Sequence, residues 1–254
     1  MVAIAKIIYP LGYSMQESAK TQGGRQRPPA EGKESTMNES LPPPMGAREW
    51  DRRYSGTAVV WGHQPNRWVA AELNGLPPGR ALDLGAGEGR HAVWLAGRGW
   101  EVEAVDFSAA GLQAGRRQAT AEGVGDRITW TVADATAFAA APDSLDLALL
   151  AYLQLPEDLL ENAVASAAAA LTAGGRFLLV SHDLANLAGG NGGPQDPDVL
   201  QTPKQVSDWL ASAGLTVLTA ETRSRPVAGS LRPALDCVVM AIREEQPPAT
   251  SPCR

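Results

Sequence analysis

A glycine-rich stretch flanked by carboxylates is the first part of the sequence whose residues suggest chemistry. Residues 81–91 read ALDLGAGEGRH, so three glycines at alternate positions follow a short apolar run. Glycines after a strand allow a backbone to approach a nucleotide closely. Asp83 and Glu88 lie within the same stretch, and carboxylates oppose a pyrophosphate but suit a cation. The stretch therefore predicts a nucleotide-binding turn for a ligand that carries positive charge.

A dinucleotide-binding turn is the main alternative. Its fingerprint, GxGxxG, would place the third glycine at residue 90, where this chain has Arg90. An arginine does not provide the close packing of helix on strand that a glycine allows. A nicotinamide-dependent oxidoreductase is therefore disfavoured, but GxGxG is a modest signal and the alternative stays open.

Groups able to transfer a proton follow two of the expected strands. His182 and Asp183 end the segment RFLLVSHD, Tyr152 ends ALLAY, and His63 lies in the loop-like VVWGHQPN. An imidazole has an ordinary pKa of about 6.5, which suits a general base near neutral pH. We expect His182, with Tyr152 second, as the catalytic candidates. The alternative is that His182 hydrogen-bonds a loop or faces solvent.

Alternating strands and helices would position these residues. Strands are predicted at 80–85, 101–108, 127–134, 143–153, 176–183, 216–222 and 234–244, and helices at 88–99, 108–123, 156–175 and 202–215. Ser108 and Thr202 are expected N-caps, and the glycine pair at 174–175 is expected to end its helix. Strands joined through helices form a parallel sheet. Only RSRPVAGSLRPA separates the last two strands, so these should pair antiparallel.

The predicted fold is therefore an α/β, Rossmann-like sheet of seven mostly parallel strands, with helices on both faces and a C-terminal antiparallel hairpin. Residues 1–44 and 244–254 have few large apolar residues and are expected to be a disordered leader and tail. The domain would span 45–243, with cap helices in 45–75. The loop from 182 to 203 is long enough to suggest a lid or a substrate wall.

Composition limits the partners. The net charge is -6, and no run of Lys or Arg is dense enough to follow a phosphate backbone, so no nucleic-acid partner is expected. No apolar run has the length of a membrane span. Two cysteines, Cys237 and Cys253, form no disulfide framework and no metal cluster, which favours a cytoplasmic protein without a metal.

LDLGAGEGR resembles motif I of the class I S-adenosylmethionine-dependent methyltransferases, and the resemblance extends from about residue 50 to 243. Asp106 matches the acidic residue that holds the ribose hydroxyls in that family, and Asp134 with Ala135 matches the position near the adenine amino group. ALTAGGRFLLVSH matches the segment before and within the fifth strand. The cofactor-binding residues implied by this resemblance are Asp83, Gly85, Ala86, Gly87, Arg90, Asp106, Phe107, Ser108, Asp134, Ala135 and Ala151.

The segment before the first strand is similar to the N-terminal cap of small-molecule methyltransferases of the tellurite-resistance and thiopurine types. It holds Trp50, Tyr54, Trp61 and Trp68. Trp50 and Trp68 are expected to pack the cap on the sheet. Trp61 either packs in the same way or lines the cofactor site, where its ring would attract a sulfonium.

The resemblance implies S-adenosylmethionine as the cofactor and a small molecule as the methyl acceptor. Methyl transfer is an in-line displacement that asks chiefly for alignment and exclusion of water, and a base only for a protonated nucleophile. ALLAYLQLP lacks the Asn/Asp-Pro-Pro-aromatic signature of DNA amino-methyltransferases. A protein that binds S-adenosylmethionine without catalysis remains a further alternative.

Overall fold

A single mixed sheet organises the chain. The computed structural model describes residues 46–56 and 60–245, and the expectations for 1–44 and for the end of the tail lie outside these residues. The strands are β1 Arg80–Leu84, β2 Glu101–Asp106, β3 Ile128–Val132, β4 Leu145–Ala151, β5 Leu171–His182, β6 Thr216–Arg225 and β7 Ala234–Ile242. The helices are α1 Ala47–Tyr54, α2 Arg67–Leu73, α3 Arg90–Ala96, α4 Ala109–Ala121, α5 Glu157–Ala169, α6 Asn186–Gly189 and α7 Pro203–Ser212, with 3-10 turns at Gly125–Arg127 and Pro197–Val199.

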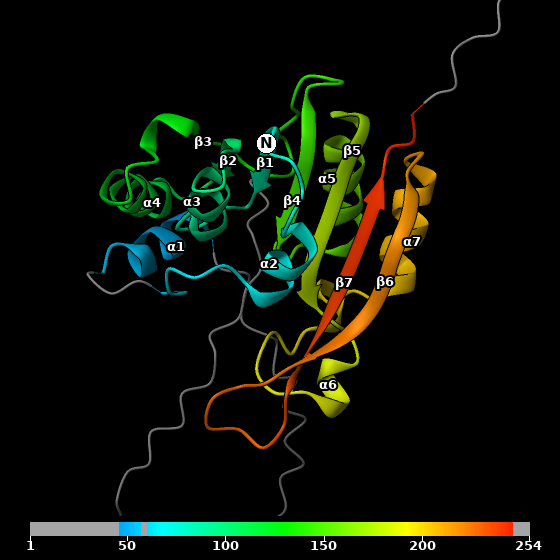
Figure 1. The fold of residues 1–254 in the computed structure, drawn as a ribbon. Coiled ribbons are helices and arrows are strands. Elements are labelled where there is room, and N and C mark those ends of the chain that lie inside the picture. Colours follow the sequence, from blue (N-terminus) through cyan, green and yellow to red (C-terminus); the bar gives the residue numbers. More distant parts are fainter. Residues whose placement is uncertain (1–45, 57–59, 246–254) are drawn as a thin grey trace, which may run out of the picture.

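The strand order is β3-β2-β1-β4-β5-β7-β6 (Figure 1). The first five strands in this order pair parallel, and β7 pairs antiparallel with both β5 and β6. The expected seven-stranded Rossmann-like sheet with a terminal antiparallel hairpin is therefore confirmed. β6 continues to Arg225, three residues beyond the predicted end, because its ladder with β7 extends to the pair Arg225–Ala234.

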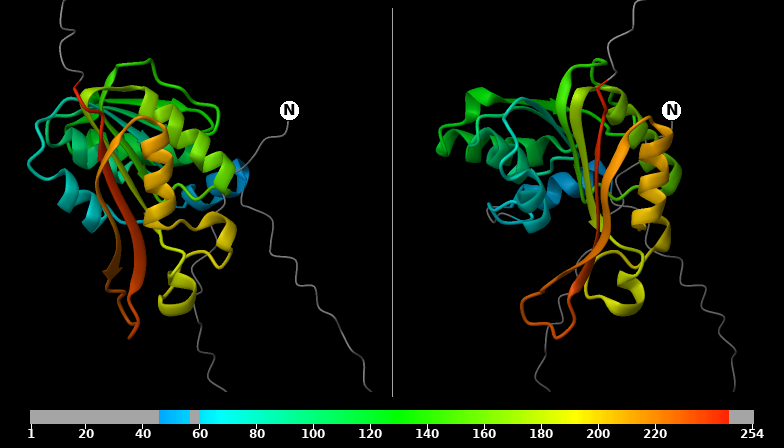
Figure 2. Two further views of the ribbon diagram at one scale, coloured as in Figure 1. Left: turned by 90° about the vertical axis from the view of Figure 1, so that its right-hand side faces the viewer. Right: turned by 45° about the vertical axis from the view of Figure 1, so that its right-hand side comes forward.

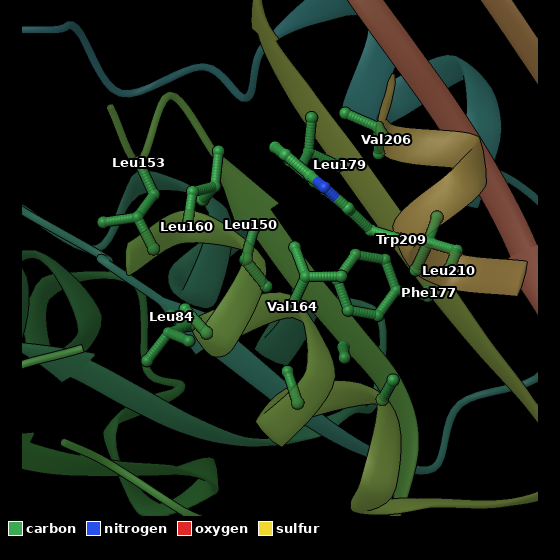
Figure 3. Close-up of a cluster of buried hydrophobic side chains, with 14 of the residues drawn as sticks. Leu84, Leu150, Leu153, Leu160, Val164, Phe177, Leu179, Val206, Trp209 and Leu210 are labelled. Carbon is green, nitrogen blue, oxygen red and sulfur yellow. The ribbon is translucent and has the colours of Figure 1, made fainter. Parts of the chain in front are cut away.

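Helices cover both faces of the sheet (Figure 2). One face packs α2, α3 and α4 against alternate residues such as Leu178 and Val180 of β5. The other face packs α5 and α7 against Phe177 and Leu179, which point the opposite way from the same strand (Figure 3). These two apolar layers fix the strand register, because a shift by one residue would turn every core side chain outward.

Two helix starts follow the expected capping chemistry. The Ser108 hydroxyl accepts a hydrogen bond from Gly111 N–H at 3.1 Å at the start of α4. Thr202 caps α7 in the same way, and Pro203 occupies the first helical position. Both predicted caps are confirmed.

The predicted end of the fifth helix was wrong. Helix α5 ends at Ala169, and β5 begins at Leu171 rather than at residue 176. Backbone pairing outweighs the helix propensity of the alanines here, because Gly174 N–H donates to Arg243 O at 2.7 Å and Leu171 lies opposite Leu145. A Cβ on Gly175 would lie 2.8 Å from Thr172 O, so the glycine pair allows an irregular strand instead of ending a helix.

The carboxyl ends of β1, β4 and β5 meet at one edge of the sheet. In Figure 1 the arrowheads of β4 and β5 point down toward the loop that carries α6, beside the connection between β6 and β7. Ligands of open α/β sheets bind at this edge. None of the helices formed by residues 46–56 and 60–245 has the length and hydrophobicity needed to cross a membrane.

Candidate active site

The glycine turn after β1 has a left-handed backbone. Gly85, Gly87 and Gly89 have φ angles of 81°, 58° and 70°, a region that side chains disfavour. A Cβ on Gly87 would lie 2.8 Å from the Tyr54 hydroxyl, and a Cβ on Gly89 would lie 2.5 Å from the Trp130 ring. Gly87 therefore makes room for Tyr54 of α1, and Gly89 makes room for Trp130 of β3 at the start of α3.

The two carboxylates of the turn have structural partners. Asp83 is 1% exposed, and its Oδ2 accepts from Ala92 N–H at 3.1 Å in the first turn of α3. Glu88 Oε2 accepts from Val60 N–H at 2.9 Å and from Trp61 N–H at 3.3 Å. Burial raises the pKa of Glu88 above its ordinary value, and these backbone bonds oppose the rise. Glu88 therefore ties the cap segment to the glycine turn.

Asp106 lies at the end of β2, where the sequence places the ribose-binding acid. Its Oδ2 accepts from Gly87 N–H at 2.9 Å and its Oδ1 from Ser108 N–H at 2.9 Å. Ser108 Oγ in turn donates to Asp51 of α1 at 2.6 Å, so α1 is docked on the start of α4. Phe107, which lies between Asp106 and Ser108 in the sequence, is half-buried. The carboxylate is thus held rigidly beside the glycine turn.

Asp134 and Ala135 follow β3. Asp134 Oδ1 accepts from the backbone and hydroxyl of Thr136 at 2.9 and 2.8 Å, which shapes a tight turn. Ala135 is 9% exposed and packs in the core layer of α5. Their role toward an adenine ring stays a prediction from the resemblance.

A cavity of about 280 Å³ opens between the glycine turn and the ends of β4 and β5. It is lined by Tyr54, Trp61, Asn66, Gly85, Ala86, Gly87, Glu88, Arg90, His91, Ala151, Tyr152, Gln154, His182, Asn191, Gly192, Gly193, Pro194, Arg225 and Val227. The volume is near the lower end of the roughly 300–1,000 Å³ typical of small-molecule sites. Eight of the predicted cofactor-binding and catalytic residues line it, and so does Glu88, the carboxylate noted in the glycine turn; the eight are Gly85, Ala86, Gly87, Arg90, Ala151, Trp61, Tyr152 and His182. Asp83, Asp106, Phe107, Ser108, Asp134 and Ala135 are not among its lining residues.

Tyr152 is held in an unusual backbone conformation directly after β4. Its φ is 55°, a strained region for a tyrosine, and its N–H donates to Val180 O at 2.7 Å. The hydroxyl accepts from Asn66 Nδ2 at 2.9 Å. Burial, and then the negative charge of Asp236, raise the pKa of Tyr152, so its phenol keeps its proton near neutral pH.

His182 ends β5 and faces the Tyr152 ring, with ring centroids 5.0 Å apart. Its side chain is 13% exposed, and Gly193 of the following loop lies so close that a Cβ there would be 2.9 Å from the imidazole. Burial lowers the pKa of His182 to about 4, the charge of Asp236 opposes the fall and that of Arg225 adds to it. The imidazole is therefore neutral near pH 7.

Tyr54, Trp61 and Asn66, from the segment before β1, line one side of the cavity. Trp61 Nε1 donates to the Tyr54 hydroxyl at 3.2 Å, and the Arg53 guanidinium lies 5.3 and 5.1 Å from the Trp50 and Trp61 ring centroids. Trp50 is 1% exposed, as expected for a packing residue. Trp61 packs in this group and also lines the cavity, and its contact with a cofactor stays a prediction.

Arg90 and His91, at the start of α3, line the cavity beside the glycine turn. Arg90 Nη1 donates to Trp61 O at 3.2 Å, and burial lowers the pKa of its guanidinium without removing its charge at neutral pH. His91 is 4% exposed, and its Nε2 accepts from Asn66 N–H at 3.2 Å. His63, by contrast, is exposed and does not line the cavity.

Asn66, Gln154, Arg225 and Asp236 were not predicted from the sequence, and Tyr54 was expected only as part of the aromatic cap segment. Asn66 and Arg225 reach the cavity from a loop and from the far hairpin, and no sequence motif marks either position. Within the described residues, Gln154 Nε2 and His182 Nδ1 are buried atoms without a hydrogen-bond partner. Unpaired buried polar atoms are costly, so Gln154 Nε2 fits a cavity built to receive a polar ligand, whereas His182 Nδ1 lies 3.7 Å from Asp236 Oδ1.

Two family models match the chain. A methyltransferase domain family matches residues 81–175, from β1 into β5. A family named for a proposed role as a stress-induced transcription regulator matches residues 180–252. In this chain the described part of the second match includes α7 and the strands β6 and β7, which belong to the same sheet as β1 to β5.

Curated relatives are methyltransferases with different acceptors. The chain is 41% identical over 81 residues to a release factor glutamine methyltransferase of Chlorobaculum tepidum, covering 31% of this chain and 28% of the relative. It is 33% identical over 118 residues to the ubiquinone/menaquinone biosynthesis C-methyltransferase UbiE of Dinoroseobacter shibae, covering 44% and 47%. It is 28% identical over 201 residues to the tRNA 5-carboxymethoxyuridine methyltransferase of Escherichia coli, covering 68% and 74%. The chain thus spans less than half the length of the first two.

Solved structures share the fold. A glycopeptide N-methyltransferase, MtfA, in complex with S-adenosylmethionine superposes with a TM-score of 0.55 at 22% identity, covering 73% of this chain and 89% of that one. A protein of echinomycin biosynthesis that converts a disulfide into a thioacetal gives a TM-score of 0.60 at 23% identity, covering 78% and 92%.

Proposed function

Because residues 81–175 match a methyltransferase domain family and the fold is shared with a solved methyltransferase, we propose that this chain is a class I S-adenosylmethionine-dependent methyltransferase that methylates a small-molecule acceptor in the cavity beside its glycine turn. The observation that carries the proposal is the cavity itself. It joins the glycine turn on one side to Tyr152, His182 and Arg225 on the other. The oxidoreductase alternative finds no support in these matches.

The cofactor side consists of the glycine turn and its neighbours. S-adenosylmethionine supplies an activated methyl group on a cationic sulfur. Gly85 and Gly87 leave room for the methionine end, and the Arg90 guanidinium is a partner of the right charge for its carboxylate. Glu88 offers negative charge beside the same turn, which suits the ammonium and the sulfonium. Asp106 would hold the ribose from the end of β2, and Trp61 would cover the cofactor with an aromatic face.

The acceptor side is built from four elements. Tyr152 and Gln154 come from the segment after β4, His182 from β5, Gly193 and its neighbours from the loop with α6, and Arg225 from β6. These residues shield the cavity from water and fix the acceptor in line with the methyl group, which is the main contribution a protein makes to such a displacement.

The size of the cavity supports a small acceptor. At about 280 Å³ it has room for the reactive end of the cofactor and a small organic group, and loops enclose it on the acceptor side. The net charge of -6 gives no general attraction to a polynucleotide. The alignment with a tRNA methyltransferase over 68% of the chain makes tRNA the acceptor to test against this proposal.

A ligand screen followed by turnover tests the proposal. Thermal shift with S-adenosylmethionine, S-adenosylhomocysteine, NAD and NADP should show stabilisation by the two sulfur compounds alone. Release of S-adenosylhomocysteine is then scored with phenols, thiols, amines and bulk tRNA. Selective stabilisation by a nicotinamide cofactor, or turnover with tRNA but with none of the small acceptors, would overturn the proposal.

A further inference from the structure

Asp236 of β7 is fully buried and does not line the cavity, but it contacts His182 and Arg225, which do. It is the register partner of His182 on β5 and of Arg223 on β6. Directly opposed residues of antiparallel strands point to the same face, and Arg225, two residues beyond Arg223, points there too. The sheet register therefore gathers His182, Asp236 and Arg225 on the face that carries the cavity.

Hydrogen bonds hold the Asp236 carboxylate in a fixed orientation beside His182. Its Oδ2 accepts from Arg225 Nε at 2.6 Å and from Trp68 Nε1 at 2.9 Å. Its Oδ1 accepts from Arg225 Nη2 at 3.2 Å and lies 3.7 Å from His182 Nδ1. Asp236 also hydrogen-bonds the Tyr152 side chain. His182 Nδ1, by contrast, is a buried atom without a partner in residues 46–56 and 60–245, and Asp236 Oδ1 is the carboxylate oxygen that faces it.

The surroundings of His182 keep this pair closed to water. Tyr152 packs against one side of the imidazole, and Gly193 packs so closely that it admits no side chain. The charged and titratable groups that face His182 are Asp236, Arg225 and Tyr152. A contact of 3.7 Å is too long for a hydrogen bond, and catalytic hydrogen bonds often tighten only when reactants bind.

We propose, on the basis of the proposed function, that Asp236 is a positioning residue that holds a hydrogen on Nδ1 of His182 and so leaves Nε2 free to take the proton of a hydroxyl acceptor. The acceptor oxygen loses its proton to Nε2 while it forms the new bond to the methyl carbon. The bond between that carbon and sulfur breaks, and its electron pair stays on the sulfur. The imidazolium that results faces the Asp236 carboxylate, so its charge is compensated where it forms.

The tautomer of His182 gives a test that does not require turnover. The chain has three histidines, so the imidazole nitrogens can be assigned in a 15N-labelled protein. At pH 7.5 the proposal expects the hydrogen of His182 on Nδ1 in the wild-type protein and a loss of that preference in Asp236→Asn. Asp146→Asn is the matched control, because Asp146 also faces an arginine, Arg80, but lies at the opposite end of β4. An unchanged tautomer in Asp236→Asn would overturn the proposal.

Turnover with paired acceptors gives the second test. Phenol arrives protonated, whereas thiophenol ionises readily and needs no base. Asp236→Asn and His182→Gln should each slow phenol methylation by about 100-fold and thiophenol methylation by less than about threefold. An equal loss on both acceptors would show that Asp236 only maintains the structure, and so would overturn the proposal.

Binding and folding controls separate the two proposals. S-adenosylmethionine affinity should be unchanged in Asp236→Asn. If the wild-type protein methylates no small acceptor, the proposed function fails, while the tautomer comparison still decides the role of Asp236. If Asp236→Asn does not fold, Arg225→Met/Asp236→Leu replaces the ion pair with apolar side chains of similar volume and is measured in the same way. Retention of the Nδ1 hydrogen in that variant would equally overturn the proposal.

Discussion

The Tyr54 hydroxyl lies directly over Gly87, so close that a Cβ on residue 87 would be 2.8 Å from it. Tyr54 belongs to α1 and Gly87 to the turn after β1, so the cap helix and the glycine turn form one wall of the cavity. Burial and the nearby charge of Asp106 raise the pKa of Tyr54, so its hydroxyl stays protonated as a donor. This contact means that the cap takes part in forming the proposed cofactor site.

Gly87→Ala should weaken S-adenosylmethionine binding by at least about tenfold. The substitution places a side chain at φ 58°, which costs about 1 kcal/mol, and adds the collision with Tyr54. Isothermal titration measures the affinity. Gly123→Ala is the control, because its φ is 71° but open space surrounds it, so strain without collision should leave binding unchanged. Affinity equal to that of the wild type in Gly87→Ala would contradict this account of the turn.

Asp106→Ala should lower the affinity for S-adenosylmethionine by about 10- to 100-fold, since a hydrogen bond to a charged group contributes about 1.5–3 kcal/mol. Stability should fall as well, because the carboxylate accepts from Gly87 and Ser108 N–H. Titration of cofactor and urea unfolding are therefore measured together. Asp126→Ala, at an exposed acid, should change neither. Lower stability with unchanged affinity would remove Asp106 from the ribose site.

His182 should make the stability of the protein depend on pH between 7 and 5. Its pKa is about 4 in the folded protein, mainly because it is buried, and about 6.5 when unfolded. The unfolded chain therefore binds more protons over this range, so the free energy of unfolding falls as pH falls, by on the order of 2 kcal/mol at pH 5. In urea unfolding, the free energy of unfolding of His182→Gln should change less between pH 7 and pH 5, by about this amount. His63→Gln, at an exposed histidine, should show the same pH dependence as the wild type.

Glu88→Ala should loosen the cap segment at residues 60 and 61. Glu88 Oε2 accepts from both of these backbone N–H groups, and bonds to a charged acceptor contribute about 1.5–3 kcal/mol. Hydrogen exchange should therefore accelerate at the Val60 and Trp61 amides by about tenfold or more. Glu122→Ala removes an exposed carboxylate and should leave both rates unchanged. Equal exchange in the two variants would show that packing of Trp61 alone holds the segment.

Local patterns were enough for most elements of the fold. The period of apolar residues located all seven strands, and Ser108 and Thr202 marked helix starts because capping involves only neighbouring residues. The same reasoning failed at Gly174 and Gly175. There the decisive bonds are made with Arg243 and Leu145, which are distant in sequence, and local propensity cannot anticipate them.

The sequence by itself determined the glycine turn, the acid at the end of β2 and the candidates Tyr152 and His182, because each follows directly from a strand and its end. Only the tertiary structure decided what surrounds them. The pairing of β5, β7 and β6 brings Asp236 and Arg225 to the site, and the segment before β1 brings Asn66. No local sequence pattern marks any of these three residues. Whether His182 is charged also depends on that assembly, since burial and the opposing charges of Asp236 and Arg225 set its pKa.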